Sequence, residues 1–259
     1  MPYIKIHRSR RTRSCSLIAA IGLCVSGLAS ADFPGGFVEQ PSYASDRPLL
    51  SQSRIQNMLP SRGKFTFPSP YNTEGVRITN GSDCGGSDCV NYVGYSYWRN
   101  MNNHVGQDTM LIFLGLDRSR GGSGPTLFEY NKVTDQVRNL GPLFNSSTSY
   151  SYASGEGWYF SATKPTKLYM NNGPRILRYD VITGAFETVF DVSSRLNNVY
   201  LHQMHSSSDD RVHSATVRAS GGGSQGCMVY FEDNKQFKFF PRKGDYDECQ
   251  VDKSGDWLV

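Results

Sequence analysis

Long hydrophobic runs and runs of like charge are missing from the chain beyond residue 31. No apolar stretch there approaches the roughly 20 residues of a membrane-spanning helix, so the sequence predicts no membrane span in the mature chain. A Walker phosphate loop is absent, and no glycine-rich dinucleotide motif or serine elbow occurs in the strand-to-helix setting that each needs. The Gly-Gly-Gly-Ser segment 221–224 is instead interpreted as a flexible hairpin loop between two strands.

Charge is scarce and balanced. Charged residues make up 19% of the chain, with 27 basic and 23 acidic residues and a net charge of +4. Five of the basic residues lie in the first 31 positions, which leaves 22 basic against 23 acidic residues in the remainder. Proteins that bind nucleic acids neutralise phosphates with clustered Lys and Arg. The sequence therefore predicts no nucleic-acid partner.

Residues 1–31 have the three-part pattern of a secretory signal peptide. A basic start precedes an apolar stretch from Cys15 to Leu28, and small residues at 29–31 precede Asp32. Such segments are removed during export, so we expect a periplasmic or secreted protein. A twin-arginine signal at Arg10-Arg11 and a lipoprotein signal at Cys24 fit their flanking residues less well.

Four cysteines remain after the signal, which agrees with export to an oxidising compartment. Cys84 and Cys89 end a glycine-rich loop that we expect to be closed by a disulfide. Half of a zinc site is the alternative, but such sites favour a closer C-x₂-C spacing. Cys227 and Cys249 are predicted to form a second disulfide.

Three segments repeat one pattern, an apolar run ending in Tyr, a polar turn and a second run. They are residues 127–137, 176–186 and 227–237, and their tyrosines Tyr130, Tyr179 and Tyr230 lie 49 and 51 positions apart. A period near 50 with strand-turn-strand content is typical of four-stranded propeller blades. Aromatic residues at 12% and 26 glycines also suit an all-β domain with many turns.

A second pattern, strand, Ser/Asp/Gly turn and strand, supports the same interpretation. Residues 200–212 match 246–258 at an offset of 46 without a gap, and looser copies are found at 149–163 and 103–113. In the copy at 149–163, Ser161-Ala162-Thr163 is matched to residues 214–216 of the second strand. The turn resembles that of TolB-type and WD40-like bacterial propellers, and the blades are similar to those of oligogalacturonate lyases.

This resemblance covers residues 95–259 and implies an all-β propeller of four-stranded blades, with about three blades and the start of a fourth. We expect a signal at 1–31, an N-terminal arm with the disulfide loop at 32–89, and blades at 90–259. An edge strand is predicted at 75–79. Trp257-Leu258-Val259 would open a second strand, so we expect the chain to be truncated, the intact protein having six to eight blades.

The first strand of each blade lines the channel of a propeller, so residues at those strands converge although they are far apart in sequence. The predicted ligand-binding residues are Trp98, Asn103, Gln203, Asp247 and Glu248. The alternative is that these polar residues are solvated channel residues without a function. Strand alternation puts Gln203 and His205 on one face, and the gapless offset puts His202 beside Glu248, which would raise the pKa of that histidine.

Two functions follow. The first is an exported binding module whose channel rim recognises a glycan, a peptide or a partner protein. The second is a polysaccharide lyase that cleaves an acidic glycan by β-elimination, with His202, His205 or Tyr150 as the base and Arg99 opposite the uronate carboxylate. Whether the protein is an enzyme is left open. The lyase resemblance also implies a divalent cation at Gln203 and His205, although the spacing departs from that family's pattern.

Overall fold

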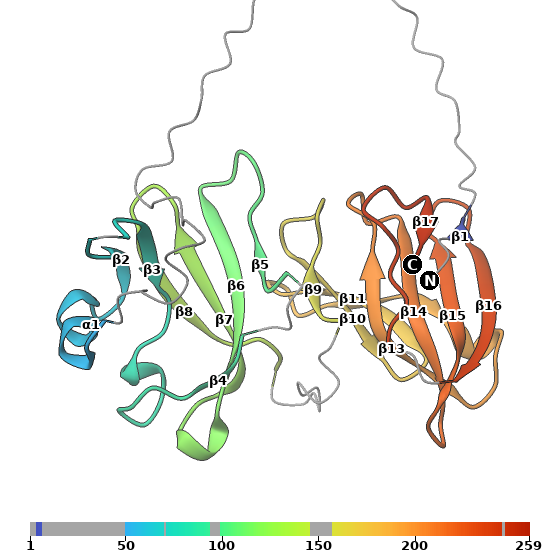
Figure 1. The fold of residues 1–259 in the computed structure, drawn as a ribbon, viewed down its shortest axis with the longest axis horizontal. Helices are drawn as coiled ribbons and strands as arrows, with labels where there is room; N and C mark the ends of the chain where they lie inside the picture. Colours follow the sequence, from blue (N-terminus) through green and yellow to red (C-terminus); the bar gives the residue numbers. More distant parts are fainter. Residues whose placement is uncertain (1–3, 7–49, 70, 94–98, 146–156, 245–246) are drawn as a thin grey trace, which may run out of the picture. The chain divides into compact units, whose positions relative to one another are not determined.

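A computed structural model of the chain describes residues 4–6, 50–69, 71–93, 99–145, 157–244 and 247–259. Two compact units are present, one within residues 9–77 and one formed by residues 78–259 together with residues 1–8. Strands dominate the described residues (Figure 1). No helix among them is both long and apolar enough to cross a membrane.

The smaller unit contains a short helix and a hairpin. The Ser51 side chain accepts a hydrogen bond from the Arg54 backbone N–H and caps the helix. Lys64 and Glu74 form an ion pair across the hairpin. The strand predicted at 75–79 is thus present, although it begins one residue earlier and ends two residues earlier. The elements are α1 (Gln52–Met58), β2 (Gly63–Thr66) and β3 (Glu74–Arg77).

The larger unit contains three consecutive antiparallel sheets, each running from a first strand outward in chain order. The predicted all-β fold of four-stranded blades is confirmed. The first sheet has β4 (Val90–Tyr92), β6 (Thr109–Leu116), β7 (Gly124–Asn131) and β8 (Gln136–Pro142), with the short β5 (Met101–Asn102) also paired to β6. The second has β9 (Tyr159–Phe160), β10 (Lys167–Asn172), β11 (Arg175–Asp180) and β12 (Phe186–Asp191). The third has β13 (Val199–Ser206), β14 (Val212–Ala219), β15 (Ser224–Phe231) and β16 (Gln236–Gly244).

The start of a further blade follows the third sheet. β17 (Trp257–Leu258) turns back on Val251, which forms a bridge to Leu258. β17 also pairs with β1 (Ile4–Lys5), and Ile6 is buried beside them. β1 lies within the segment that the sequence predicts to be removed, so a mature chain beginning at Asp32 would lack this pairing.

The tyrosine repeat marks the hairpin between the third and fourth strands of each blade. Five residues after the tyrosine, each turn has a residue in the left-handed conformation, Asp135 (φ 56°), Gly184 (φ 73°) and Lys235 (φ 55°). Turns with positive φ match the twist of the strands that they join. The equal position of this residue in all three turns confirms the period that the sequence predicts.

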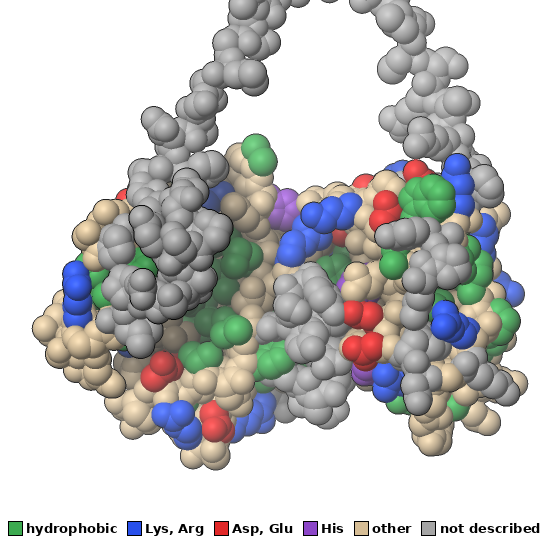
Figure 2. Space-filling view, viewed as in Figure 1, with side chains coloured by type: hydrophobic (Ala, Val, Ile, Leu, Met, Phe, Trp, Pro, Cys, Tyr) green, Lys and Arg blue, Asp and Glu red, His purple; other side chains and the backbone are tan. Residues whose placement is uncertain are grey.

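The apolar residues of the three sheets pack face to face in successive layers. One core lies between the first and second sheets, a second between the second and third sheets, and a third between the third sheet and the segment that leads to β17. A fourth core lies on the outer side of the first sheet, against the segment that contains Cys84 and Cys89. Each sheet therefore has its apolar side chains covered by a neighbouring sheet or segment, as expected of propeller blades. On the face drawn in Figure 2, acidic and basic side chains of the described residues are interspersed.

A buried carboxylate links the second and third blades. Asp210, in the turn after β13, is 3% exposed and accepts hydrogen bonds from the Ser161 hydroxyl (2.6 Å), the Ala162 N–H (3.1 Å) and both the N–H and hydroxyl of Thr163 (2.8 and 2.7 Å). Ser161–Thr163 is thus the turn after β9. The sequence comparison that placed these residues in a second strand is wrong, because the first strand of this blade lies at 159–160.

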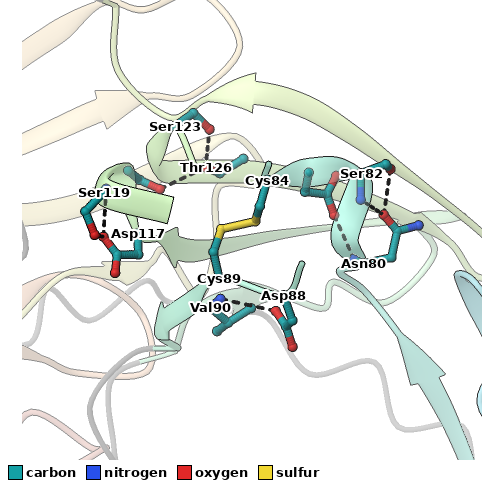
Figure 3. The surroundings of a disulfide bond; sticks show 12 residues. Asn80, Ser82, Cys84, Asp88, Cys89, Val90, Asp117, Ser119, Ser123 and Thr126 are labelled. Carbon is teal, nitrogen blue, oxygen red and sulfur yellow. Dashed lines mark hydrogen bonds between the residues drawn. A yellow bond between two sulfur atoms is a disulfide. The ribbon is translucent and has the colours of Figure 1, made fainter. Parts of the chain in front are cut away.

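Both predicted disulfides are present. Cys84 and Cys89 close the glycine-rich loop (Figure 3), with a Cα–Cα distance of 6.1 Å. Asn80 and Asp83 cap the short helical turn before Cys84, since Asp83 accepts a hydrogen bond from the Asn80 N–H. Cys227 on β15 is joined to Cys249, which fastens the third sheet to the segment that begins the next blade.

Replacing Asp210 by Asn tests the link between blades. Asn keeps the shape and tolerates the positive φ, but its amide group presents a donor to the buried N–H groups of the neighbouring turn. We expect the free energy of unfolding to fall by about 2–3 kcal/mol, measured by urea denaturation of the full chain. Asp233→Asn, which removes a surface ion pair with Arg211, should cost less than about 1 kcal/mol. Equal effects of the two changes would contradict the assigned role of Asp210.

Candidate functional site

A β-bulge in β13 decides where the predicted histidines lie. His202 pairs with Thr216 of β14 and His205 pairs with Ser214, so that two residues of β13 face one residue of β14 between these pairs. Gln203, inside the bulge, has a φ of +49°. Ser214 and Thr216 are two positions apart and share a face, so His202 and His205 share it as well. The regular alternation that put these two histidines on opposite faces is therefore broken.

The histidine beside Glu248 is His205. Its Nε2 lies 3.1 Å from Glu248 Oε2, and the two side chains are 12% and 14% exposed. Burial lowers the pKa of His205 below its ordinary value, and this effect outweighs the hydrogen bond and charge of Glu248, which act in the opposite direction. The sequence expectation of a histidine with a raised pKa beside Glu248 is thus contradicted, because it neglected burial.

The predicted cation ligands are engaged with other residues. Gln203 is 3% exposed, and its Oε1 lies 3.0 Å from His202 Nδ1, while His205 Nε2 is paired with Glu248. Within the described ranges, no group of three or more His, Cys, Asp or Glu side chains is arranged to hold a metal ion. These residues therefore do not fit a divalent cation in the arrangement seen here.

A cavity of about 430 Å³ lies where the first strands of successive blades meet. Tyr159 on β9 contributes to it, and so do His205 and Ser206 at the end of β13. Residues before β5 and in the segment leading to β17 complete the wall. Its lining is Arg99, Tyr159, His205, Ser206, Ser208, Gln250, Val251, Asp252 and Lys253. This is the position, at the first strands, where the sequence predicts a ligand.

Two cationic side chains of the cavity have no hydrogen-bond or ion-pair partner among the described residues. Arg99 and Lys253 are exposed, and neither side chain has a hydrogen bond or ion pair in the part of the chain that the structure describes. Asp252, the carboxylate in the same lining, accepts hydrogen bonds from the Ser254 hydroxyl and from the N–H groups of Asp256 and Trp257. The Asp252 carboxylate is therefore engaged within its own turn, whereas the charges of Arg99 and Lys253 are accessible to a ligand.

A hydrogen-bonded chain of side chains runs from the cavity into the protein. The Tyr159 hydroxyl is bonded to Ser206 Oγ, and Ser206 Oγ is bonded to Nδ1 of His213, which is fully buried. On its other side, His213 Nε2 lies 2.8 Å from Glu232 Oε1. Burial raises the pKa of Tyr159 well above its ordinary value, so this phenol keeps its proton at neutral pH.

Glu232 is held in place at the inner end of this chain. Arg178 Nη1 lies 3.1 and 3.2 Å from its two carboxylate oxygens, and the Tyr169 hydroxyl donates to it at 3.3 Å. Burial alone would raise the pKa of Glu232, but the hydrogen bond from His213 and the charge of Arg178 lower it to about 2. Glu232 is therefore ionised at neutral pH.

The other predicted residues that the structure describes do not line this cavity. Asn103, in the turn after β5, accepts a hydrogen bond from Lys132 Nζ (3.2 Å). The Asp247 carboxylate is 76% exposed and lies 4.0 Å from Arg218 Nη2. Trp98 and Tyr150 fall outside the described residues. Of the predicted site residues, the cavity therefore contains Arg99 and His205, with Glu248 hydrogen-bonded to the latter.

Sequence reasoning missed Tyr159, Ser206 and Lys253. The turns after the first strands show how they could have been found. Ser161, Ser207 and Asp252 each begin one of these turns, and their side chains accept hydrogen bonds from backbone N–H groups further along the turn. An alignment anchored on these residues gives an offset of 45 between Ser207 and Asp252, and it sets Tyr159 at the level of His205.

A histidine titration followed by NMR tests the assignment of His205. We expect its pKa to lie below about 6.5, and to fall further in Glu248→Gln, because burial then acts without the opposing carboxylate. Since the folded pKa is depressed, His205 contributes stability that is present above about pH 6.5 and is lost as the pH falls through the folded pKa. The resonance is assigned by its loss in His205→Asn. A pKa above 6.5 in the unchanged protein would contradict the burial argument.

No protein-family model and no curated protein sequence matches this chain. Similar solved structures include TolB from Acinetobacter baumannii, at 14% identity over 76% of this chain and 41% of that chain, with a TM-score of 0.44. An oligogalacturonate lyase in complex with manganese is 12% identical over 73% of this chain and 49% of that chain, with a TM-score of 0.47. The oligogalacturonate lyase from Vibrio parahaemolyticus is 12% identical over 69% and 46%, with a TM-score of 0.44.

The chain thus spans less than half the length of each of these three proteins. Both kinds of propeller named by the sequence resemblance, TolB and oligogalacturonate lyase, are among the structures similar to it. At such low identity the similarity concerns the fold alone.

Proposed function

We propose that this chain is part of an exported β-propeller that binds an acidic glycan fragment in the cavity at the first strands. The observation that carries the proposal is a pair of cations, Arg99 and Lys253, in one cavity with the polar side chains of Tyr159, His205 and Gln250. Neither cation has an ion pair with another described residue. A carboxylate entering this cavity would gain charge-assisted hydrogen bonds, which are about twice as strong as neutral ones.

The size of the cavity favours a small ligand over a protein surface. Ligand cavities typically measure about 300–1,000 Å³, and this one measures about 430 Å³. A stable protein partner needs about 800 Å² of surface on each side. A sugar acid with several hydroxyl groups also matches the mixture of amide, phenol, imidazole and hydroxyl groups in the lining better than an apolar ligand does.

Export to the periplasm or the medium is part of the same proposal. Both disulfides need an oxidising compartment to persist, and acidic polysaccharide fragments are extracellular ligands. The N-terminal pattern of basic start, apolar stretch and small-residue site supplies the route.

Calorimetric titration with fragments of pectin, alginate or ulvan tests the binding function. We expect one of these acidic oligosaccharides to bind at low ionic strength, and Arg99→Ala and Lys253→Ala each to weaken binding by about tenfold, because each removes one charge-assisted contact. Lys235→Ala, in the turn between β15 and β16, is the matched control and should leave the affinity unchanged. Binding that is equally strong in all three variants would reject this cavity as the site.

A lyase is the second candidate, and one observation favours it. Arg99 and His205 line the same cavity, and the lowered pKa of His205 leaves its imidazole largely neutral near pH 7. A neutral imidazole can accept the C5 proton of a uronate while a guanidinium neutralises the neighbouring carboxylate.

Absorbance at about 235 nm distinguishes the lyase from the binding module, because it reports the unsaturated uronate that β-elimination forms. A lyase would produce a rise that disappears in His205→Ala and Arg99→Ala and persists in His202→Ala, because His202 is not part of the cavity lining. Tight binding without any rise in absorbance would reject the lyase and retain the binding module.

A further inference from the structure

The Ser206 hydroxyl differs from the other hydroxyl groups of the cavity because it is hydrogen-bonded to a buried histidine, which is in turn hydrogen-bonded to a carboxylate. It is the last residue of β13 and lies directly opposite His213 on β14. Its Oγ is bonded to His213 Nδ1, and His213 Nε2 is 2.8 Å from Glu232. Ser206 is only partly buried and lines the cavity, whereas His213 is fully buried.

The partners of His213 determine which nitrogen holds its proton. Glu232 is a carboxylate at neutral pH and only accepts hydrogen bonds, so the proton of the neutral imidazole belongs on Nε2. The lone pair of Nδ1 then points at Ser206 Oγ. A serine hydroxyl, an imidazole that can accept its proton and a carboxylate that orients the imidazole are the parts of an activated nucleophile.

The orientations of His213 and Glu232 are fixed by contacts with Arg178 and Tyr169. Arg178 bonds to both oxygens of Glu232, and the Tyr169 ring packs against the His213 ring at a centroid distance of 5.0 Å. Neither Glu232 nor His213 can turn away without breaking these contacts. Catalytic constellations require such support, because loosely held groups lose the geometry that the reaction needs.

We infer that Ser206 is a nucleophile that hydrolyses small carboxylic esters bound in this cavity, with His213 as general base and Glu232 as the orienting carboxylate. Ser206 Oγ attacks the acyl carbon while its proton passes to His213 Nδ1. The ester C–O bond then breaks, and His213 returns the proton to the departing alkoxide. Water, deprotonated by the same nitrogen, attacks the acyl-serine, releases the carboxylic acid and restores the Ser206 hydroxyl.

Tyr159 supplies a donor for the charge that develops during this reaction. Its hydroxyl is bonded to Ser206 Oγ and keeps its proton at neutral pH. When the acyl carbon becomes tetrahedral, its oxygen gains negative charge within reach of this phenol. A donor held in place for such an oxyanion contributes to the rate by a factor of about 100–1,000 in other hydrolytic sites.

This activity goes beyond the proposed binding function and does not depend on the acidic ligand. The cavity would hold the ester, and the two cations could hold an acidic group attached to it, but the reaction needs only the acyl group. Triads of this kind are recognised by geometry and not by sequence position. The absence of a strand-to-helix serine elbow therefore does not exclude it.

Two probes test the inference on the full chain, a fluorophosphonate that labels activated serines and p-nitrophenyl acetate as a small ester. We expect labelling of Ser206, identified by mass spectrometry, and release of p-nitrophenol above the rate in buffer. Ser206→Ala should abolish both signals, and Ser220→Ala, which changes an exposed serine in the turn between β14 and β15 outside the cavity lining, should retain them. His213→Asn should slow hydrolysis by about 100-fold or more.

Further variants keep the inference testable if Ser206→Ala or His213→Asn disturbs the fold. Circular dichroism checks folding, and Ser206→Cys should be alkylated by iodoacetamide faster than Ser208→Cys, because His213 activates the thiol. Tyr159→Phe should reduce the rate of ester hydrolysis more than it changes the Michaelis constant. Absence of labelling at Ser206 in folded protein, or equal alkylation of the two cysteine variants, would show that the chain of hydrogen bonds serves the packing of the blades alone.

Discussion

Each of the three large sheets has apolar side chains on both faces, and this constraint determines the rest of the larger unit. A sheet with two apolar faces must be covered twice, and four cores provide that cover: one on the outer side of the first sheet, two between successive sheets, and one beyond the third sheet. Stacking of this kind aligns the first strands of neighbouring sheets along one line. The polar residues at the ends of those strands then meet, and the cavity of about 430 Å³ forms among them.

One local irregularity, the β-bulge in β13, determines the direction in which the polar side chains near the cavity point. The bulge in β13 turns His205 towards Glu248 on one side of the strand and leaves Ser206 to face Tyr159 and His213 on the other. Without the extra residue, His205 and Ser206 would each point to the opposite face of the strand. Bulges commonly re-aim side chains next to functional sites, and here one bulge brings a histidine and a serine from adjacent positions into one cavity lining.

The sequence predicted those features that depend on local chemistry. The hairpins after Tyr130, Tyr179 and Tyr230 repeat because each needs a residue with positive φ at the same place, and a repeat of that kind is visible in one dimension. The closed loop between Cys84 and Cys89 is equally local. The partner of Glu248 was assigned to the wrong histidine because the bulge appears only when the pairing of β13 with β14 is known.

Burial is the second property that the sequence alone does not reveal. A carboxylate beside a histidine suggests a raised pKa, yet the low exposure of His205 reverses the direction. The chain from Ser206 to Glu232 cannot be found in the sequence for a related reason, since Ser206 and His213 lie on different strands, Glu232 lies in the turn after β15, and the three satisfy no spacing rule. Their association is a consequence of pairing across β13, β14 and the end of β15.

The disulfide between Cys227 and Cys249 has a consequence for where the cavity can be completed. Cys249 immediately precedes Gln250, Val251, Asp252 and Lys253, which form one wall of the cavity. A covalent tether to β15 removes most of the freedom that this segment has in the unfolded chain. In a reducing compartment the wall would be held by hydrogen bonds and packing alone. Formation of the Cys227–Cys249 bond would therefore be the step that fixes this wall of the cavity in place.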